Sequence, residues 1–599
     1  MISLDLESLR HGYRSGRLQP KDTIAEVYRR IGVRGDRPVW IELVPEQRAL
    51  ARVEELDESL PLYGIPFAVK DNIDAAGLPT TAGCPNYAYT PTKSATVVER
   101  LVAAGAVLVG KTNLDQFATG LVGVRSPYGA CSSVFDDGYI SGGSSAGSAV
   151  AVAAGLVSFS LGTDTAGSGR VPAAFNNIVG CKPTRGAVSA VGVVPACRTL
   201  DCVSVFALTC GDALEVMRVA AGYDPLDPFS RLGEEASPWL GGLFRFGVPP
   251  SGQLEFFGDH AAADLFRAAQ DQLASLGGTP VEIDFAPFRA VAEILYSGPW
   301  VAERLAAIRK FFSEHQADMD PTVRAIIGGG ARYTAVETYA AMYRLAELRQ
   351  QTTAEWTRMD VMLLPTTGTI YSIDDVKSDP IKLNSNLGFY TNFVNLLDLA
   401  AVAVPAGFRE TGLPFGITLM GPAWTDSALL ILADCFHRAR QAKLGGTDFA
   451  LASTPALAAP ETPPGCVLVG VVGAHLSGET LNWQLTERRA RLVRTCRTAP
   501  DYRLYALNGP TPPKPGLIRD LSFDGPGIEL EVWAMPVAGF GSFVAAVPPP
   551  LSIGSIEPGD GSVVKGFLCE PFAISSAEEI TTLGGWRKYI SSRARAVRQ

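Results

Sequence analysis

The chain has 599 residues, of which 47% are apolar and 19% are charged, and its formal net charge is −9. This composition excludes a disordered or collagen-like chain, and the length predicts more than one domain. The acidic balance argues against nucleic acid or an anionic membrane surface as the main partner. It does not exclude a small anionic substrate, because one buried arginine decides such binding locally.

Membrane, export and metal signals are missing from the sequence. The longest apolar candidate, residues 148–161, is shorter than the ~18 residues that a membrane span needs. Asp5, Glu7 and Arg10 stand where a signal peptide would be apolar. Ten cysteines form no Cys-x-x-Cys pair, which predicts reduced thiols rather than a metal or redox site. We therefore expect a cytoplasmic protein without a metal or a membrane partner.

A change of composition divides the chain. Residues 450–465 are rich in Ala, Pro and Thr and lack apolar periodicity, which predicts a linker. It separates a body, residues 1–449, from a tail, residues 466–599.

Helical and strand-like segments alternate along the body. Helices are expected at 21–31, 46–60, 96–104 and 146–155, and short strands at 65–69, 106–109, 156–161, 361–364 and 401–404. This alternation predicts an α/β domain with a mixed, largely buried sheet. Residues 254–301 and 335–358 are expected to be mainly helical and to form a lobe over the site.

The tail has a different pattern. Strands are expected at 466–472, 502–507, 528–534, 542–547 and 563–569, and a helix at 477–493. These elements predict a small α+β domain of barrel-like form.

The most informative segment, residues 141–173, is rich in glycine and serine. A phosphate-binding loop is excluded because Ser148 stands where lysine is required. Residues 143–147 fit the G-x-S-x-G pattern of a nucleophile elbow, but residues 135–139 are turn-like where that motif needs a strand. The elbow also needs a histidine, and the three available, on amphipathic helices, are expected to be satisfied or solvent-facing: His260, His315 and His437. A third interpretation uses two serines and a lysine, with backbone N–H groups of the Gly-Ser turns binding an oxyanion.

Three separated motifs favour that third interpretation. They are Lys70-Asp71-Asn72 after an apolar strand, Gly142-Gly143-Ser144-Ser145, and the segment from Gly162 to Arg170 (GTDTAGSGR). Together they resemble the amidase signature family, with a similarity that extends over the body to about Phe449. The resemblance implies a mixed sheet surrounded by helices and no organic cofactor.

The resemblance also implies roles for individual residues. Ser168 is the nucleophile, Ser144, expected before a cis peptide bond, relays the proton, and Lys70 is the base. Desolvation by the apolar strand before Lys70 would lower its pKa enough for that task. The oxyanion would be held by backbone N–H groups of Thr165, Ala166, Gly167 and Ser168 itself. Asp164 and Arg170 are expected to form an ion pair that shapes the loop.

A second resemblance concerns the substrate. Residues 295–304 look like the substrate segment of allophanate hydrolases, in which Tyr296 and Arg304 would hold the substrate carboxylate. Their spacing of eight places both on one face of a single helix. An arginine fork binds a carboxylate through two parallel hydrogen bonds.

The tail resembles the C-terminal domain of the same hydrolases, which is similar to the γ-glutamyl cyclotransferase fold. The similarity lies in residues 473–478 and 482–485. His475 follows a buried strand and is expected to precede a helix starting near Ser477, where free N–H groups favour an anion. Alternatively, His475 caps the helix or packs in the core. No Met-Lys-Met biotin-attachment motif is present, so no fused carboxylase is expected.

The resemblances imply hydrolysis of allophanate (urea-1-carboxylate) to ammonia and carbon dioxide through N-carboxycarbamate. They also imply a homodimer and a functional link to a separate urea carboxylase. The allophanate could come from urea or from s-triazine breakdown. Two alternatives stay open: another small-acid amidase with a malonamate-like substrate, and an amidotransferase subunit that supplies ammonia to a partner.

Overall fold

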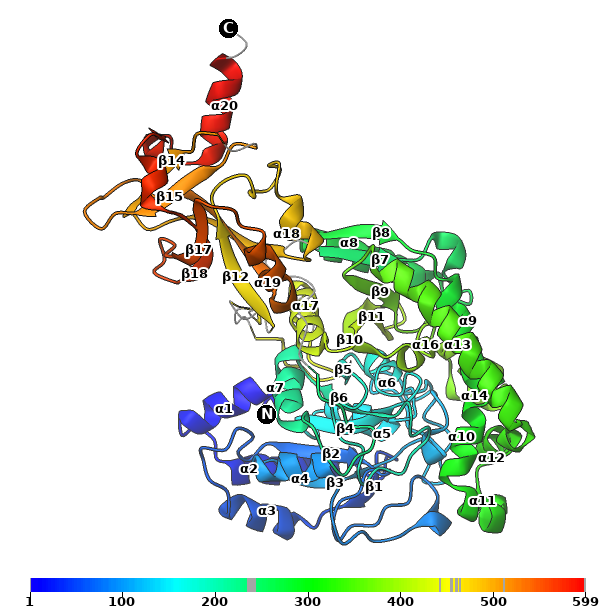
Figure 1. Ribbon diagram of the computed structural model, residues 1–599. Coiled ribbons are helices and arrows are strands. Elements are labelled where there is room, and N and C mark those ends of the chain that lie inside the picture. Colours follow the sequence, from blue (N-terminus) through cyan, green and yellow to red (C-terminus); the bar gives the residue numbers. More distant parts are fainter. Residues whose placement is uncertain are drawn as a thin grey trace. The chain divides into compact units, whose positions relative to one another are not determined.

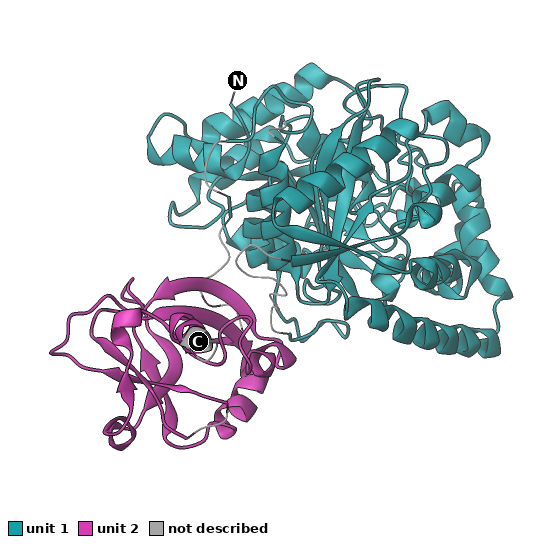
Figure 2. Cartoon of the chain, turned by 90° about the horizontal axis from the view of Figure 1, so that it is seen from above, with its two compact units in different colours: residues 1–233, 244–457 teal, residues 234–243, 458–599 magenta. Residues whose placement is uncertain are grey.

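The computed structural model describes residues 2–233, 244–440, 443–452, 456–457, 462, 465–509 and 512–596. The chain divides into two compact units, residues 1–233 with 244–457 and residues 234–243 with 458–599 (Figure 2). Much of the linker predicted at 450–465 lies outside the described residues. Among the described residues, no helix is both long and apolar enough to cross a membrane.

One large mixed sheet forms the centre of the first unit (Figure 1). In the described residues it has eleven strands, in the spatial order β1 (Trp40–Leu43), β3 (Val107–Thr112), β2 (Pro66–Lys70), β4 (Phe159–Asp164), β6 (Cys202–Ala207), β5 (Val179–Lys182), β10 (Leu399–Phe408), β11 (Pro414–Pro422), β9 (Val361–Pro365), β7 (Phe244–Val248) and β8 (Gly278–Glu282). The pairs β2–β3, β2–β4, β7–β8 and β7–β9 are parallel, and the others are antiparallel. The predicted α/β domain with a mixed sheet is confirmed.

Helices flank this sheet along the whole unit (Figure 1). They are α1 (Leu6–Arg14), α2 (Pro20–Arg34), α3 (Glu46–Glu54), α4 (Thr96–Ala103), α5 (Ala146–Ala153), α6 (Val171–Phe175), α7 (Cys210–Ala220), α8 (His260–Ser275), α9 (Ala286–Ser297), α10 (Trp300–Ala307), α11 (Arg309–His315), α12 (Pro321–Gly328), α13 (Ala335–Trp356), α14 (Ile373–Ser378), α15 (Lys382–Leu387), α16 (Phe393–Leu396) and α17 (Asp426–Ala439).

Three predicted elements of this unit differ from the structure. The helix expected at 46–60 ends at Glu54, and the strand expected at 156–161 is shifted toward the C-terminus, into β4. The segment 254–301, expected to be mainly helical, contains the strand β8. Pro280 is tolerated there because β8 is an edge strand of the sheet.

Two elements bring the sequence motifs together in space. Strand β2 is buried along its whole length between the parallel strands β3 and β4, which explains its continuous apolar run. Helix α5 is also entirely buried and consists of small residues. A Cβ atom on Gly147 would lie 2.6 Å from the backbone nitrogen of Asn113, so glycine permits this close approach. The end of β2 and the start of α5 can therefore meet.

The second unit contains two smaller sheets. In its described residues, one has the order β13 (Arg491–Arg497), β16 (Glu529–Pro536), β12 (Cys466–Val471), β18 (Val564–Cys569), β17 (Leu551–Ile556), and the other the order β15 (Pro515–Arg519), β14 (Tyr502–Ala506), β19 (Glu578–Glu579). The helices are α18 (Trp483–Glu487), α19 (Val537–Ala545) and α20 (Trp586–Ala596).

Two predictions for the tail are wrong. The strand expected at 542–547 begins inside helix α19, and most of the helix expected at 477–493 is irregular or belongs to β13. Within that segment, all of which the structure describes, the helical part is α18. A short apolar run is compatible with either state, and the packing against β12 and β16 decides for helix in α19.

Candidate active site

Lys70 is the last residue of the buried strand β2, and its side chain is fully buried. Its Nζ atom donates hydrogen bonds to Ser144 Oγ and to Thr163 Oγ1, both at 2.7 Å. Burial lowers the pKa of Lys70 to about 7, against the opposing effect of the carboxylates of Asp115, Asp201 and Asp164. Lys70 is thus a lysine that can accept a proton near neutral pH.

Ser144 lies at the entry to helix α5, directly after a cis peptide bond between Gly143 and Ser144. The expectation of a cis bond after Ser144 is therefore corrected by one residue. The Ser144 carbonyl accepts a hydrogen bond from the backbone N–H of Asp115 at 3.0 Å. These contacts hold Ser144 between Lys70 and the loop that contains Asp115.

Asp115 organises that loop, although no sequence motif singles it out. Its carboxylate accepts hydrogen bonds from the backbone N–H groups of Val122, Gly123 and Arg125, at 3.1, 3.0 and 2.9 Å. A Cβ atom on Gly143 would collide with the same carboxylate. The segment that surrounds Ser144 is therefore folded around one buried acid.

Ser168 is buried, with 3% of its surface exposed, and its Oγ donates to the carbonyl of Gly120 at 3.5 Å. No hydrogen bond joins Ser168 directly to Ser144 among the described residues. Both serines are nevertheless held against one short loop, since Ser144 contacts Asp115 and a Cβ atom on Gly120 would lie 2.6 Å from Asp115 Oδ2. Asp115 thus contacts both Ser144 and Gly120, the residue whose carbonyl accepts the Ser168 hydrogen bond.

The loop before Ser168 is shaped by a buried ion pair. Arg170 donates two hydrogen bonds to the Asp164 carboxylate, at 2.9 and 3.0 Å, as expected for a loop-shaping pair. The same carboxylate accepts the backbone N–H of Gly167 at 2.8 Å. Gly167 is one of the predicted oxyanion donors, and this bond occupies its N–H.

The other predicted oxyanion donors, unlike Gly167, have backbone N–H groups that are not already used. In the part of the chain that the structure describes, the backbone N–H groups of Thr165, Ala166 and Ser168 have no acceptor. The Thr165 hydroxyl donates to Asp201 Oδ1 at 2.5 Å. Burial raises the pKa of Asp201 to about 6.

Ser145, the alternative nucleophile of the elbow interpretation, is fully buried. Its hydroxyl donates to the carbonyl of Thr163 at 3.1 Å and accepts the N–H of Thr163 at 3.3 Å. A hydroxyl with both roles filled by backbone groups is structural, and the turn-like residues 135–139 remain without a regular strand. Neither observation favours an elbow.

Arg304 and Tyr296 meet, although not on one helix. Tyr296 lies in α9 and Arg304 in α10, with a break at Gly298 and Pro299, so the expectation of a single continuous helix is wrong. Arg304 Nη2 still lies 3.4 Å from Tyr296 Oη, and the guanidinium is stacked 5.5 Å from the Tyr296 ring centroid. The helix break turns the two side chains toward each other.

Arg304 is only 3% exposed, and its guanidinium has neutral partners. Its Nη1 donates to Thr119 Oγ1 at 3.1 Å and to the carbonyl of Ala118 at 3.4 Å. Among the described residues, no carboxylate lies within ion-pair distance of it. The Asp201 and Glu303 carboxylates act on Arg304 from beyond ion-pair distance. A buried cation without a direct ion pair is costly, so this arrangement favours binding of a small anion. Thr119 precedes Gly120, which contacts Ser168, so the cation lies beside the loop that contacts Ser168.

The histidines do not contribute to this site. His260 begins α8 and His315 ends α11, and both are exposed, as expected. His437 differs from expectation: it is fully buried in α17, and neither ring nitrogen has a partner among the described residues. Burial lowers the pKa of His437 to about 4, so its imidazole is neutral. No group of His, Cys, Asp and Glu in the described residues could hold a metal ion.

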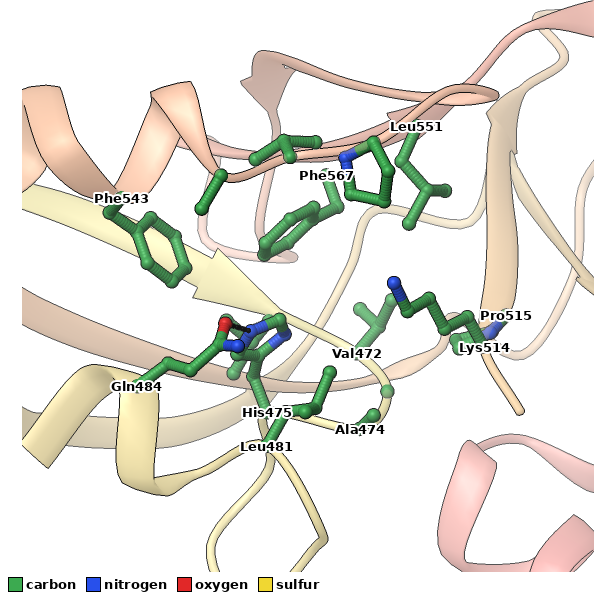
Figure 3. A pocket seen from close by; sticks show the side chains of 15 residues that line it. Val472, Ala474, His475, Leu481, Gln484, Lys514, Pro515, Phe543, Leu551 and Phe567 are labelled. Carbon is green, nitrogen blue, oxygen red and sulfur yellow. Dashed lines mark hydrogen bonds between the residues drawn. The ribbon is translucent and has the colours of Figure 1, made fainter. Parts of the chain in front are cut away.

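His475 lines a small cavity of about 90 Å³ in the second unit (Figure 3). Its ring stacks on Phe567, with centroids 4.9 Å apart, and its Nε2 lies 3.0 Å from Gln484 Oε1. Because a carboxamide oxygen only accepts, Nε2 donates and Nδ1 is left as an acceptor. Burial lowers the pKa of His475. The cavity therefore holds a neutral imidazole of defined tautomer.

The expected helix start beside His475 is wrong. Helix α18 begins at Trp483, and the N–H of Ser477 donates instead to Glu531 at 2.8 Å. Helix N–H groups therefore do not supply an anion site at His475. Sequence reasoning missed Lys514, whose amine points into the cavity (Figure 3). Apart from Lys514, His475 and Gln484, the lining residues are apolar or glycine.

Comparisons with known proteins agree with this geometry. The Amidase family matches residues 24–430, and the Allophanate hydrolase C-terminal domain family matches residues 467–591. Urea amidolyase of Saccharomyces cerevisiae is 44% identical over 92% of this chain, and the chain spans only about a third (31%) of that relative's length. A glutamyl-tRNA(Gln) amidotransferase subunit of Geobacillus thermodenitrificans is 34% identical over 70% of this chain and 93% of its own length.

Among solved structures, the allophanate hydrolase of Kluyveromyces lactis superposes with a TM-score of 0.81 at 42% identity, covering 97% of this chain and 98% of that one. The resemblance drawn from the sequence motifs is confirmed. The chain therefore belongs to the amidase family, which acts on amide C–N bonds, and it carries in addition an allophanate hydrolase C-terminal domain.

Proposed function

We propose that this chain hydrolyses allophanate, with Ser168 as nucleophile, Ser144 as proton relay and Lys70 as base. The observation that carries the proposal is Arg304, a buried guanidinium without a carboxylate partner among the described residues, beside the loop that contacts Ser168. Allophanate has a carboxylate at one end and a carbamoyl group at the other. Arg304 and Tyr296 would hold the first while Ser168 attacks the second.

The Lys70 contacts give the proton a path. Ser168 transfers its proton to Ser144 as it attacks the terminal carbamoyl carbon, and Ser144 passes its own proton to Lys70 across the 2.7 Å hydrogen bond. The N–H groups of Thr165, Ala166 and Ser168 would hold the oxyanion. The proton returns to the departing nitrogen, so ammonia leaves and an acyl-Ser168 ester remains. Water then releases N-carboxycarbamate.

The second unit is proposed to assist the last step. N-carboxycarbamate becomes carbamate and carbon dioxide when its nitrogen takes up one proton and one C–N bond breaks. The cavity offers one amine, Lys514, one imidazole, His475, and walls that are largely apolar. Such walls desolvate a carboxylate, whose charge disperses as carbon dioxide leaves.

The test is ammonia release by the purified full-length protein from allophanate and from a set of neutral amides. We expect turnover of allophanate and little turnover of neutral amides. A preference for neutral amides would contradict the proposal, and no turnover without a partner protein would favour an amidotransferase-type subunit.

Location and partners are part of the same proposal. The ten cysteines are free, in support of a reducing compartment such as the cytoplasm. A functional link to a urea carboxylase that would supply allophanate is proposed from the similarity to urea amidolyase. A homodimer is proposed only as an expectation from the family resemblance.

A further inference from the structure

Asp201 and Thr165 are brought opposite each other by the pairing of two strands. Strand β4 ends at Asp164, β6 begins at Cys202, and these two residues are partners in the antiparallel register. The position after β4 and the position before β6 therefore face each other. These positions are Thr165 and Asp201, and the Thr165 hydroxyl donates a hydrogen bond to Asp201 Oδ1 at 2.5 Å. The pair thus joins the loop before Ser168 to the segment before β6.

The Asp201 carboxylate is fixed by the backbone of its own turn. Its Oδ2 accepts the N–H of Ala196 at 2.9 Å, and its Oδ1 accepts the N–H of Cys197 at 3.2 Å. The backbone N–H groups of Leu200 and Asp201 donate to the Cys197 carbonyl, at 2.9 and 2.8 Å, and close the turn. A group is oriented best when its support is itself held by further hydrogen bonds. Asp201 is therefore a rigid anchor for Thr165.

Thr165 has two polar groups that can donate, and only one of them is used within the described part of the chain. Its hydroxyl is bound to Asp201, whereas its backbone N–H, one of the predicted oxyanion donors, has no acceptor there. The residue is 2% exposed, and a buried N–H without an acceptor costs free energy. Only the Cα and Cβ atoms separate the hydroxyl from the N–H. A fixed hydroxyl therefore limits how far the N–H can turn.

Asp164 holds the same loop in a different way. Its carboxylate accepts the backbone N–H of Gly167 at 2.8 Å, so this acid occupies one of the predicted oxyanion donors. Asp201 takes a side-chain donor instead, and among the described residues the Thr165 N–H stays available. Both acids fix the loop before Ser168, but only the contact made by Asp201 keeps a backbone donor for the oxyanion.

We propose that Asp201 is a positioning residue that, through the Thr165 hydroxyl, orients the Thr165 N–H toward the oxyanion formed at the carbon attacked by Ser168. This inference rests on the proposed function. The oxyanion develops only as that carbon becomes tetrahedral, so the hydrogen bond from the N–H is strongest in the transition state. Displacement of this donor should therefore lower kcat and leave KM nearly unchanged.

The main variant is Thr165→Val, which removes the hydroxyl but keeps the branched shape and the backbone N–H. Loss of a whole oxyanion donor lowers kcat ~10²- to 10³-fold, so we expect loss of its anchor to lower kcat for allophanate about 10- to 100-fold, with KM changed less than about 3-fold. Rates are measured well above the Lys70 pKa of about 7, where a shift of that pKa has little effect. Thr165→Ser keeps the hydroxyl and should recover at least about 10-fold of the loss.

A double variant tests whether the two residues act through one bond. Asp201→Ala removes the anchor and should also lower kcat. Adding Thr165→Val to Asp201→Ala should lower kcat less than about 3-fold further, because both changes break the same hydrogen bond. Full additivity of the two losses would contradict a role of Asp201 through Thr165.

A second measurement does not depend on the fraction of folded enzyme. Phosphonoacetate has a carboxylate at one end and a tetrahedral anionic phosphorus group at the other, so it resembles the tetrahedral state of a substrate that Arg304 and Ser168 hold. Its inhibition constant should rise about 10- to 100-fold in Thr165→Val, in step with the fall of kcat/KM. An unchanged kcat and an unchanged inhibition constant would overturn the role of Asp201.

Thr184→Val is the matched control. The Thr184 hydroxyl donates to Asp426 Oδ2 at 2.6 Å, the same kind of pair in the same unit, and in the described residues no hydrogen bond joins that pair to the catalytic serines or lysine. This variant should leave the phosphonoacetate inhibition constant within about 2-fold of the wild type. A rise equal to that in Thr165→Val would contradict a specific role of Asp201. Failure of the wild-type protein to hydrolyse allophanate would overturn the proposed function together with this assignment.

Discussion

Two lysines show how differently the two units are built. Lys70 is fully buried, its amine is held by two hydroxyl oxygens at 2.7 Å, and its pKa falls to about 7. Lys514 is half-buried, and its amine points into a cavity with largely apolar walls (Figure 3). Burial makes Lys70 a base near neutral pH. Lys514 instead places its amine at a cavity, where it can contact a bound group.

The residues around the two lysines also differ between the two units. The amidase site consists of hydrogen bonds between segments far apart in the sequence, such as Lys70, Ser144 and Thr163. The tail cavity consists of packed rings, with His475 in contact with both Phe543 and Phe567. Under the proposed function, the first arrangement would move protons and the second would desolvate a bound group. Substitutions can disrupt the amidase site and the tail cavity separately, and their different effects test this comparison.

Loss of the nucleophile should have the largest effect. Ser168→Ala is expected to abolish ammonia release, and Lys70→Ala to lower kcat by at least ~10³-fold, because a triad acts as a unit. Ammonia release by the purified variants is the measurement. Ser145→Ala is the control, since that hydroxyl binds only the backbone of Thr163 among the described residues. Near-normal turnover by Ser168→Ala with loss in Ser145→Ala would revive the nucleophile elbow.

Removal of the Arg304 guanidinium should have the next largest effect. Arg304→Ala removes charge-assisted hydrogen bonds worth ~1.5–3 kcal/mol, so kcat/KM for allophanate should fall ~10- to 150-fold. A neutral amide of similar size should be affected much less. Arg289→Ala is a control, because Arg289 pairs with Glu293 and stacks on Phe389, and among the described residues no hydrogen bond joins it to Thr119 or Tyr296. Equal losses on charged and neutral substrates would show that Arg304 is structural.

The amidase motifs can be found from the sequence because each is short and contiguous. Lys70, Ser144 and Ser168 lie in three such motifs, and the structure brings Lys70 and Ser144 into hydrogen-bond contact. Asp115 and Thr119 carry no such signal. They reach the site through a loop whose backbone folds around one carboxylate, and no local pattern records that.

In the tail, sequence analysis assigns some segments to the wrong secondary structure. Residues 542–545 and 491–493 are predicted in the wrong state because short apolar or alternating runs fit helix and strand alike, and only packing separates them. The helix break between Tyr296 and Arg304 also escapes prediction, although Gly298-Pro299 marks it in retrospect. Side-chain contact there depends on the break, which periodicity alone does not describe.

The pKa of Lys70 gives a prediction with a definite sign. The base must be neutral to accept a proton, so kcat/KM should rise with pH and level off above about 7, falling about tenfold per unit below it. Asp201→Asn should move this midpoint to lower pH, because the Asp201 carboxylate raises the pKa of Lys70. A pH–rate profile checks both. A midpoint unchanged in Asp201→Asn, or moved upward, would contradict the assignment of that limb to Lys70.

The smallest effect on ammonia release is expected from the tail. His475→Ala removes the ring that packs on Phe543 and Phe567 and leaves the amidase site untouched, so release of the first ammonia should stay within about 2-fold of the wild type. If the cavity serves decarboxylation, N-carboxycarbamate should persist longer, and carbon-13 NMR on labelled allophanate would follow it. Lys514→Met should act in the same direction, since it removes the amine but keeps an apolar side chain of similar length. His315→Ala, at an exposed helix end, is the control and should change neither step. If neither His475→Ala nor Lys514→Met changes the decay of the intermediate, the cavity has no part in decarboxylation. The proposed desolvating role of the second unit would then be wrong.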